Sequence, residues 1–330
     1  MVATSVTVVA PDSVRTWYRA FANPDEPVLF VGEEPGHVQA IVDAVLGKED
    51  PTCVRLFSSH QSLARDREVA ARLAAAGLSV RVQSETAMRA GLDKAYARHL
   101  LAMHGVPLSP WGIGRPTGRD IGALLRKARN STQSQGIAWA RPDDSWGDDV
   151  YWEQYVAGTE YSVVVYREAG ATTILPPVWK GDTRRDLLPP WKRLRLCPPP
   201  PAPTGVLEDL VDIARTVADA IDAWGFAEVE FVAAPQCPTM VLEVNPRICG
   251  TMRIAAMAAR VSIFDGRQLP GDMRHHEATA YAGELPYQGP AILEADVIAT
   301  SRITCRASSP GRVRELLEAY GGAAHWPEAW

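Results

Sequence analysis

One short segment holds polar side chains in an order that suits the binding of metal ions. Residues 240–247 read Met-Val-Leu-Glu-Val-Asn-Pro-Arg. In a β-strand, alternate side chains share a face, so Glu243 and Asn245 would project together, and Arg247 would follow the end of the strand. An acidic strand lies upstream, and a short proline-containing connection predicts a hairpin that brings its Glu230 beside Glu243. Two carboxylates, an amide oxygen and a nearby guanidinium suit Mg²⁺ ions that carry a polyphosphate.

The composition narrows the class of protein around this segment. The chain has 330 residues, of which 46% are hydrophobic, which is enough for a large core and two or three subdomains. A net charge of −5 argues against a nucleic-acid partner. No apolar stretch reaches the roughly 18 residues of a membrane span, and the N-terminus lacks the basic region of a signal peptide. We expect a protein with small-molecule substrates, no nucleic-acid partner and no membrane partner; a homodimer is left open.

The cysteines point to a reducing compartment. The five cysteines are scattered and show neither a disulfide framework nor the paired spacing of a zinc site. A cytoplasmic location is therefore expected. Cys249 lies close to the acidic hairpin, but a free cysteine is more often a small buried apolar residue than a nucleophile.

Alternating strand and helix patterns fill the first 90 or so residues. Expected strands at 5–10, 27–31, 53–57 and 78–82 are separated by apolar residues at helical spacing, as in 38–46. This order predicts a parallel sheet with crossover helices, a Rossmann-like domain.

Later segments are more varied. An amphipathic helix is expected at 92–101 and a longer one at 206–224, with a shorter one at 251–259 after the acidic hairpin. Residues 181–203 are basic and rich in proline, and are expected to form an irregular surface segment. The tail is expected to hold a strand at 295–300 and a further helix.

The order of these features resembles the ATP-grasp ligases, the superfamily of biotin carboxylase, carbamoyl phosphate synthetase and D-alanine–D-alanine ligase. The string Glu-Val-Asn-Pro-Arg at 243–247, after an acidic strand, resembles the metal strand of that family. A helix that opens with Lys94 resembles the first ATP lysine, and Lys127 resembles the second. The two residues after Lys127 replace the proline that relatives carry, so the direction of this side chain stays open. Only five of the 34 basic residues are lysines, which gives a lysine at a motif position more weight.

The polar loop 131–136 lies where the family has a flexible lid over the phosphates. The resemblance implies that Ser131, Ser134 and Gly136 offer hydroxyl or backbone N–H donors to phosphate oxygens. Taken without its flanks, a plain polar loop describes the segment equally well.

The next motif resembles the family's adenine hinge. It consists of Glu153, Gln154, Tyr155 and Val156, whose backbone would pair with the base while Glu153 accepts from its amino group. Seven residues on, Glu160 matches the acid that holds the ribose hydroxyls, because a carboxylate can accept two neighbouring hydroxyl hydrogens.

The resemblance implies both a fold and a domain plan. The expected fold class is α/β and α+β, with a Rossmann-like parallel-sheet domain at 1–91 followed by a two-lobed ATP-grasp domain. The small lid subdomain would span 92–151, and the large lobe, with the metal site and a C-terminal extension, 152–330.

The resemblance also implies an activity. The length and the metal strand most resemble stand-alone members similar to carbamoyl phosphate synthetase halves and the pyrrolysine biosynthetic ligase. We expect an ATP-dependent carboxylate–amine ligase that joins amino acids through an acyl phosphate, releasing ADP and phosphate. Two Mg²⁺ ions, or Mn²⁺, would be held by Glu230, Glu243 and Asn245, with Arg247 and Lys127 as catalytic residues. A carboxylate–thiol ligase for a carrier protein, or a degenerate nucleotide-binding protein, are the alternatives.

Basic residues between the hinge and the acidic hairpin are candidates for binding a substrate carboxylate. Arg184 and Arg185 are the main candidates there, with Arg193 and Arg195 nearby, and Arg253 lies just beyond the metal strand. A solvated basic loop is the alternative.

Overall fold

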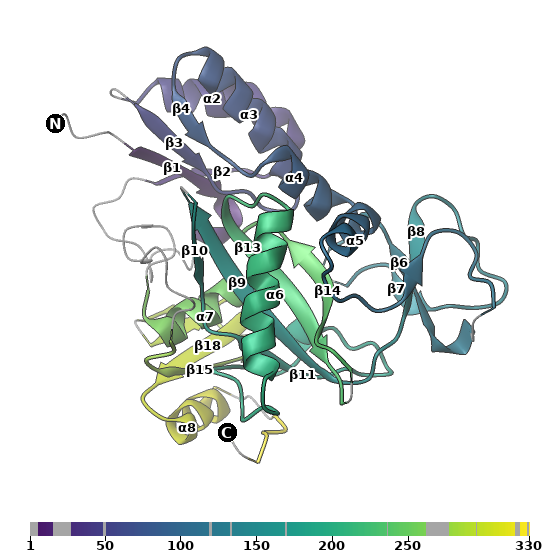
Figure 1. Cartoon of the computed structure of the whole chain (residues 1–330). Coiled ribbons are helices and arrows are strands. Elements are labelled where there is room, and N and C mark those ends of the chain that lie inside the picture. Colours follow the sequence, from purple (N-terminus) through teal and green to yellow (C-terminus); the bar gives the residue numbers. More distant parts are fainter. Residues whose placement is uncertain are drawn as a thin grey trace.

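The protein is described by a computed structural model with three β-sheets (Figure 1). The described residues are 6–15, 28–48, 51–118, 121–132, 134–168, 170–235, 237–261, 277–294, 296–320, 324–328 and 330. None of the helices in these ranges combines the length and the apolar character needed to span a bilayer.

The N-terminal sheet is parallel, as the alternating pattern predicts. Its strand order is β2-β1-β3-β4, with β1 at Val6–Pro11, β2 at Val28–Val31, β3 at Cys53–Leu56 and β4 at Ser79–Arg81. Helices α2 (Val38–Leu46) and α3 (Leu63–Ala75) share an apolar core with these strands. Two expected strand ends, Ser5 and Pro27, lie outside the described residues.

Two helices lead from this sheet to the rest of the molecule. Helix α4 spans Glu85–Leu92 and α5 spans Lys94–Met103. The single expected helix at 92–101 is therefore split, because the side chain of Asp93 caps α5 by accepting from the N–H groups of Ala95 and Tyr96. This cap makes Lys94 the first residue of α5.

The small sheet is antiparallel and lies apart from the others in Figure 1. Its order is β5-β8-β6-β7, with β5 at Trp111–Gly112, β6 at Leu124–Ala128, β7 at Ile137–Trp139 and β8 at Val150–Gln154. A 3-10 turn, η3 (Ile121–Ala123), precedes β6. The whole of β8 pairs within this sheet, so we propose that the lid subdomain ends after residue 154 and not at 151.

The large sheet has ten strands and carries the acidic hairpin at one edge. Its order is β14-β13-β9-β11-β12-β15-β18-β17-β16, and β10 pairs with β9. The strands are β9 (Thr159–Glu168), β10 (Ala171–Ile174), β11 (Val178–Asp182), β12 (Arg195–Cys197), β13 (Gly225–Ala233), β14 (Met240–Asn245), β15 (Tyr281–Pro286), β16 (Ile292–Leu293), β17 (Val297–Ala299) and β18 (Arg302–Ala307).

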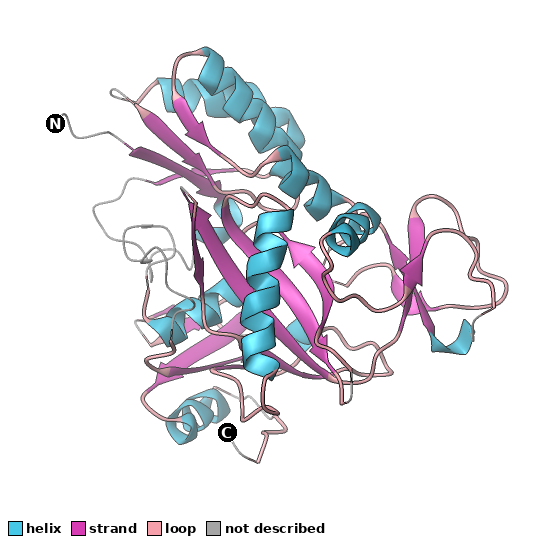
Figure 2. Ribbon diagram, viewed as in Figure 1, coloured by secondary structure: helices cyan, strands magenta, loops and turns pink. Residues whose placement is uncertain are grey.

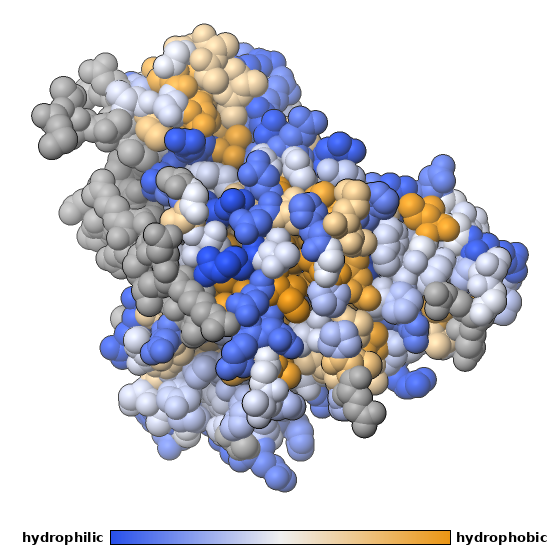
Figure 3. Space-filling view, viewed as in Figure 1, coloured by the Kyte–Doolittle hydropathy of each residue, from blue (hydrophilic) through white to orange (hydrophobic). Residues whose placement is uncertain are grey.

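Three helices cover the large sheet (Figure 2). Helix α6 (Val206–Ala220) lies across β9 and β13 with an apolar face inward, and hydrophilic residues follow its outer side (Figure 3). Helix α7 (Thr251–Ala259) is buried along its whole length, and α8 (Pro310–Ala319) packs against β15 and β18.

One expectation about the basic segment is wrong. Residues 181–203 were expected to be irregular, yet β12 lies inside this range and pairs with both β11 and β15 in the interior of the sheet. Leu194 and Leu196 are buried there, so two apolar residues among the arginines were enough for a short strand. The segment before it keeps its irregular form, apart from the 3-10 turn η4 (Pro190–Lys192).

The N-terminal sheet contacts the segment that follows the metal strand. The N–H of Ile248 donates to the carbonyl of Ser58, at 3.0 Å, in the loop after β3. A Cβ on Gly91, at the end of α4, would lie 2.9 Å from Pro246 Cγ, so only glycine allows this approach.

Candidate active site

The β13–β14 hairpin brings the predicted acidic side chains together. Glu230 pairs directly with Glu243 in the strand register, and Glu228 pairs with Asn245. The register shifts just after Glu230, which leaves Leu242 as an extra residue in β14. The predicted hairpin is therefore confirmed, with a bulge at the site that simple alternation did not indicate.

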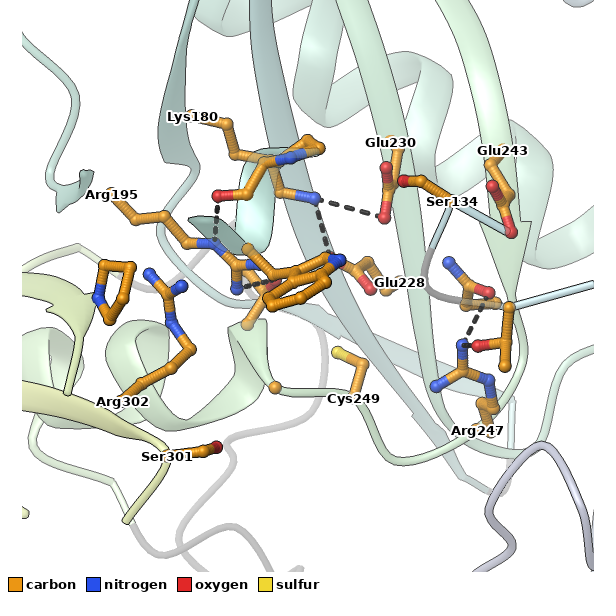
Figure 4. Close-up of a pocket in the computed structure, with 17 residues that line it drawn as sticks. Ser134, Lys180, Arg195, Glu228, Glu230, Glu243, Arg247, Cys249, Ser301 and Arg302 are labelled. Carbon is orange, nitrogen blue, oxygen red and sulfur yellow. Dashed lines mark hydrogen bonds and ion pairs between the residues drawn. The ribbon is translucent and has the colours of Figure 1, made fainter. Parts of the chain in front are cut away.

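These residues line a cavity of about 370 Å³ (Figure 4). Figure 4 shows Glu243 and Arg247 toward one side of the cavity, Arg195 and Arg302 toward the other, and Cys249 between them. The rest of the lining comes from the lid loop, from β11, β13, β14 and η4, from the start of α7, from β15 and from the turn between β17 and β18. These residues are Thr132, Ser134, Lys180, Pro190, Trp191, Glu228, Glu230, Asn245, Gly250, Thr251, Pro286 and Ser301.

A buried lysine that the motifs did not reveal lies among the carboxylates. Lys180 Nζ on β11 lies 3.2 Å from Glu228 and 3.1 Å from Glu230. Burial would raise the pKa of Glu228, but Lys180 and hydrogen bonds from Thr251 and Ser162 lower it to about 2. Glu230 lacks these hydroxyl partners. Its pKa is raised by burial and by the charges of Glu228 and Glu243, although Lys180 opposes the shift.

Arg247 links the metal strand to the lid loop. Its Nη2 donates to Asn245 Oδ1 at 3.0 Å and to Thr132 Oγ at 3.3 Å. His60, in the loop after β3, lies close enough that its pKa is lowered by burial and then by the charge of Arg247. Cys249 is buried next to this group. Burial and the charge of Glu228 raise its pKa, so its thiol stays protonated.

Lys94, at the start of α5, contacts both the metal strand and the lid loop. Its Nζ lies 3.5 Å from Glu243 Oε1 and donates to Ser131 Oγ at 3.0 Å. The side chain is buried, so Lys94 is not a solvated lysine on the surface of its helix. Of the predicted lid residues, Ser134 lines the 370 Å³ cavity. Gly136 lines neither this cavity nor the smaller one described below, and it lies in the turn between β6 and β7 with a φ of 70°.

A second cavity, of about 110 Å³, adjoins the first and shares Ser134, Pro190, Glu230 and Glu243 with it. It lies between the small and large sheets and is lined by the whole predicted hinge and by Glu160. Most of the residues predicted to bind the nucleotide thus meet here, whereas Lys94, Ser131 and Gly136 do not line this cavity. With Ser134, those that do are Lys127, Glu153, Gln154, Tyr155, Val156 and Glu160.

Lys127 points into this second cavity, which settles its direction. Its Nζ lies 2.5 Å from Glu153 Oε2, while Arg126 on the other face bonds to a backbone carbonyl at the surface. Arg98 of α5 and Ser109 contact the other oxygen of Glu153, each at 2.5 Å. Burial would raise the pKa of Glu153, but Arg98 and Lys127 lower it. Glu153 is therefore ionised, with both oxygens already engaged by the protein.

The hinge leaves one backbone donor available. The N–H groups of Gln154 and Tyr155 donate to the carbonyls of Pro110 and Ala123, at 2.8 and 2.9 Å. Among the described residues, the N–H of Val156 has no such partner, so it can meet the edge of a base. Glu160 lines the same cavity, and Arg193 Nη2 lies 2.9 Å from its carboxylate.

The arginines expected to bind substrate fall into different places. Arg184 lines the second cavity and pairs with Asp186, while Arg185 stacks over Trp139 and Tyr155. Arg253 lines neither cavity, because it is buried against Glu284. The large cavity is reached instead by two other arginines, Arg195, which was a minor candidate, and Arg302, which sequence reasoning missed.

The donor set fits a metal ion that arrives on a polyphosphate. Glu230 and Glu243 are each about one quarter exposed, at 23% and 24%, and Asn245 adds an amide oxygen. In the described ranges no three His, Cys, Asp or Glu side chains form a complete metal cage. Mg²⁺ bound to nucleotide takes most of its ligands from phosphate and water, so one or two carboxylates are sufficient.

Known structures share this architecture. Carboxyaminoimidazole ribonucleotide synthase from Aspergillus clavatus, complexed with ATP, has a TM-score of 0.72 and 16% identity, over 96% of this chain and 97% of that chain. Biotin carboxylase from Campylobacter jejuni has a TM-score of 0.69 and 14% identity, over 96% and 90% of the two chains. L-amino acid ligase from Bacillus licheniformis has a TM-score of 0.68 and 13% identity, over 96% and 98%.

These similarities establish the fold. The chain has the ATP-grasp fold, in agreement with the resemblance stated from its motifs. Comparison with models of protein families gives no match, and comparison with curated protein sequences gives none either.

Proposed function

We propose that the protein is an ATP-dependent carboxylate–amine ligase that joins amino acids and forms ADP and phosphate. The observation that carries this proposal is the junction of the two cavities at Glu230 and Glu243. A nucleotide in the smaller cavity would direct its terminal phosphate toward these carboxylates. The structural relatives include enzymes solved with ATP and with ADP, which supports ATP as the nucleotide.

The first step would transfer the γ-phosphoryl group to a substrate carboxylate. All reacting groups are anionic, so neutralising charge is the main demand on the site. Mg²⁺, held by Glu230, Glu243 and Asn245, would neutralise phosphate charge when bound. Lys94 and Lys127 would add positive charge from the lid side.

The second step would be attack by an amine on the acyl phosphate. Arg247 would stabilise the oxyanion that forms, and its position at the cavity wall beside Asn245 supports this role. The acyl phosphate hydrolyses in water, so the lid loop must cover it. Ser131 and Thr132 already contact Lys94 and Arg247, which supports this covering role.

The two alternatives have less support. A thiol acceptor on a carrier protein would need a surface for that carrier, and no feature of the described residues favours one. A degenerate nucleotide-binding protein is disfavoured because Lys127, Glu230, Glu243 and Asn245 line the cavities and Lys94 lies 3.5 Å from Glu243.

The test is an analysis of nucleotide products. The protein is incubated with Mg-ATP, a panel of amino acids and hydroxylamine, and the nucleotides and hydroxamates are then separated. An acyl phosphate predicts ADP and phosphate, and a hydroxamate when the natural acceptor is left out. AMP and pyrophosphate as the main products would rule the mechanism out.

A further inference from the structure

Three arginines in the interior share a single carboxylate. Glu284 on β15 is completely buried, and Arg195, Arg253 and Arg302 all form ion pairs with it. Thr304 also donates to this carboxylate, at 2.7 Å. Glu284 alone cannot neutralise three guanidinium groups in a place where water is scarce. Glu228 balances part of the charge of Arg195, which lies close enough to lower the pKa of Glu228.

Two of these arginines face the large cavity and are poorly satisfied. Arg302 bonds to Glu284 through Nε and to the carbonyl of Arg193 through Nη2, but its buried Nη1 has no hydrogen-bond partner among the described residues. Within the same residues, the contacts of Arg195 are all long, at 3.4 Å to Pro190 and Thr251 and 3.5 Å to Glu284. Both residues contact the same oxygen of Glu284, so their guanidinium groups are held close together.

The third arginine differs from the other two. Arg253 makes two contacts with the second oxygen of Glu284 and one with Thr300, and it does not line the cavity. Burial, followed by the charges of Arg195 and Arg253, lowers the pKa of Arg302 to about 10 although Glu284 opposes the shift. An anion beside Arg195 and Arg302 would relieve this repulsion and satisfy the free donors.

The position of Arg195 and Arg302 in the large cavity indicates which substrate they would bind. The smaller cavity meets the large one at Ser134, Pro190, Glu230 and Glu243. Neither Arg195 nor Arg302 lines the smaller cavity, although Arg195 Nε lies 3.4 Å from the carbonyl of Pro190. In Figure 4 the two arginines lie across the cavity from Glu243 and Arg247. The activated carboxylate must lie next to the γ-phosphate, so the acceptor that attacks it enters from the far end.

We propose that Arg195 and Arg302, held by Glu284, form a subsite for the non-reacting carboxylate of the amine acceptor. The acceptor is therefore an amino acid with a free carboxylate and not a simple amine. This inference rests on the proposed ligase function and names the acceptor class. Two neighbouring guanidinium forks match the planar shape of a carboxylate. Pro286 lies opposite Arg302 in the strand register, and with Trp191 it adds apolar surface to the cavity, which suits the carbon skeleton of an amino acid.

The test measures binding and does not depend on turnover. Calorimetric titration in the presence of ADP and MgCl₂ is run with the common amino acids, with the carboxamide of the best binder, and with inorganic phosphate. The amino acid is expected to bind at least tenfold more tightly than its carboxamide, because the amide cannot pair with the two arginines. Inorganic phosphate is expected to bind more weakly than the amino acid.

The variants separate recognition from folding. Arg302→Gln is expected to remove the preference for the acid over the amide, and Arg302→Lys to keep part of it. Arg253→Gln removes an equally buried partner of Glu284 that does not line the cavity, and it is expected to bind the amino acid within about threefold of the unmodified protein. Circular dichroism of each variant establishes that it is folded before titration.

Several results would overturn the subsite. These are equal binding of acid and amide, no binding of any amino acid, tighter binding of phosphate than of any amino acid, or an equal loss in Arg253→Gln and Arg302→Gln. The ligase proposal is judged separately by ADP formation. Selective binding of the acid without ADP formation would support the subsite and contradict the ligase proposal. ADP formation with equal use of acid and amide would support the ligase proposal and contradict the subsite.

Discussion

Glu230 and Glu243 lie directly opposite each other on the two strands of the acidic hairpin. Like charges at paired positions of a sheet repel, and such pairs typically destabilise by about 0.2–1 kcal/mol. Lys180 offsets part of this repulsion from one side, at 3.1 Å from Glu230, and Lys94 from the other, at 3.5 Å from Glu243. The remaining negative charge faces the cavity, where a bound cation would be stabilised.

Removing one of the two charges should stop the reaction without harming the fold. We expect Glu243→Gln to lower ADP formation by at least about 100-fold, in the range seen when an electrostatic group of an active site is removed. Its thermal midpoint should not fall, because the repulsion with Glu230 is relieved. ADP release and thermal unfolding are compared with those of Glu208→Gln, on the exposed side of α6. Wild-type activity of Glu243→Gln at saturating Mg²⁺ would contradict the metal role.

The ribose contact should act on binding more than on chemistry. Glu160→Ala is expected to raise the KM for ATP by at least about tenfold, the value of one hydrogen bond to a charged group, with little change in kcat. The reason is that ribose contacts are similar in the ground and transition states. Steady-state kinetics with varied ATP check this. A fall in kcat at unchanged KM would refute the assignment.

The cluster around Glu284 should make stability depend on pH in a defined direction. Burial would raise the pKa of Glu284, but Arg302, Arg253 and Arg195 outweigh it and hold that pKa far below its usual value of 4.5. A lowered pKa means that the stabilisation is complete above about pH 4.5 and is lost as the pH falls toward the folded-state pKa.

Glu284→Gln is therefore expected to lower the free energy of unfolding by about 3–5 kcal/mol near pH 7. The difference from the unmodified protein should stay constant down to about pH 5 and shrink below pH 4.5. Urea unfolding across this range measures it. As a control, Glu315→Gln breaks an exposed pair with Arg312 and should change stability by less than about 1 kcal/mol. A difference in the free energy of unfolding that grows as the pH falls would contradict the predicted direction.

The buried thiol in the large cavity should be dispensable. Burial and the charge of Glu228 keep the pKa of Cys249 high, so little thiolate exists near pH 7. We expect Cys249→Ala to keep at least about half of the ADP-forming activity and iodoacetamide to leave the unmodified protein active. Complete loss of activity in a folded Cys249→Ala variant would favour covalent catalysis.

The motif residues could be predicted because each belongs to a short, continuous sequence motif. The hinge, Glu160 and Glu243 belong to short strings and line the two adjoining cavities, and Lys94, from another such string, contacts Glu243. Lys180 was missed because its partners lie 48 and 50 residues away, on a neighbouring part of the sheet. The scarcity of lysine could have singled it out, since Lys94, Lys127 and Lys180 are three of only five and all are buried.

Arg302 carried no comparable signal. Its strand was not predicted, and its role depends on Glu284, which is 18 residues away on a paired strand. The bulge at Leu242 could not be predicted from the sequence either, because the alternation of side chains along one strand does not determine the register of its partner strand. The roles of the individual site residues, the cytoplasmic location and a homodimer stay predictions.

The contacts of Ser58 with Ile248 and of Gly91 with Pro246 have a practical consequence for anyone who shortens or recombines this protein. The parallel sheet and α4 pack against the turn that follows the metal strand, so this sheet is not a detachable module. A fragment that begins near residue 92 would expose Pro246 and Ile248 to water and release the turn that aims Arg247. Chimeras with other enzymes of this fold should therefore exchange the N-terminal sheet and the strand-to-helix turn at 246–250 together.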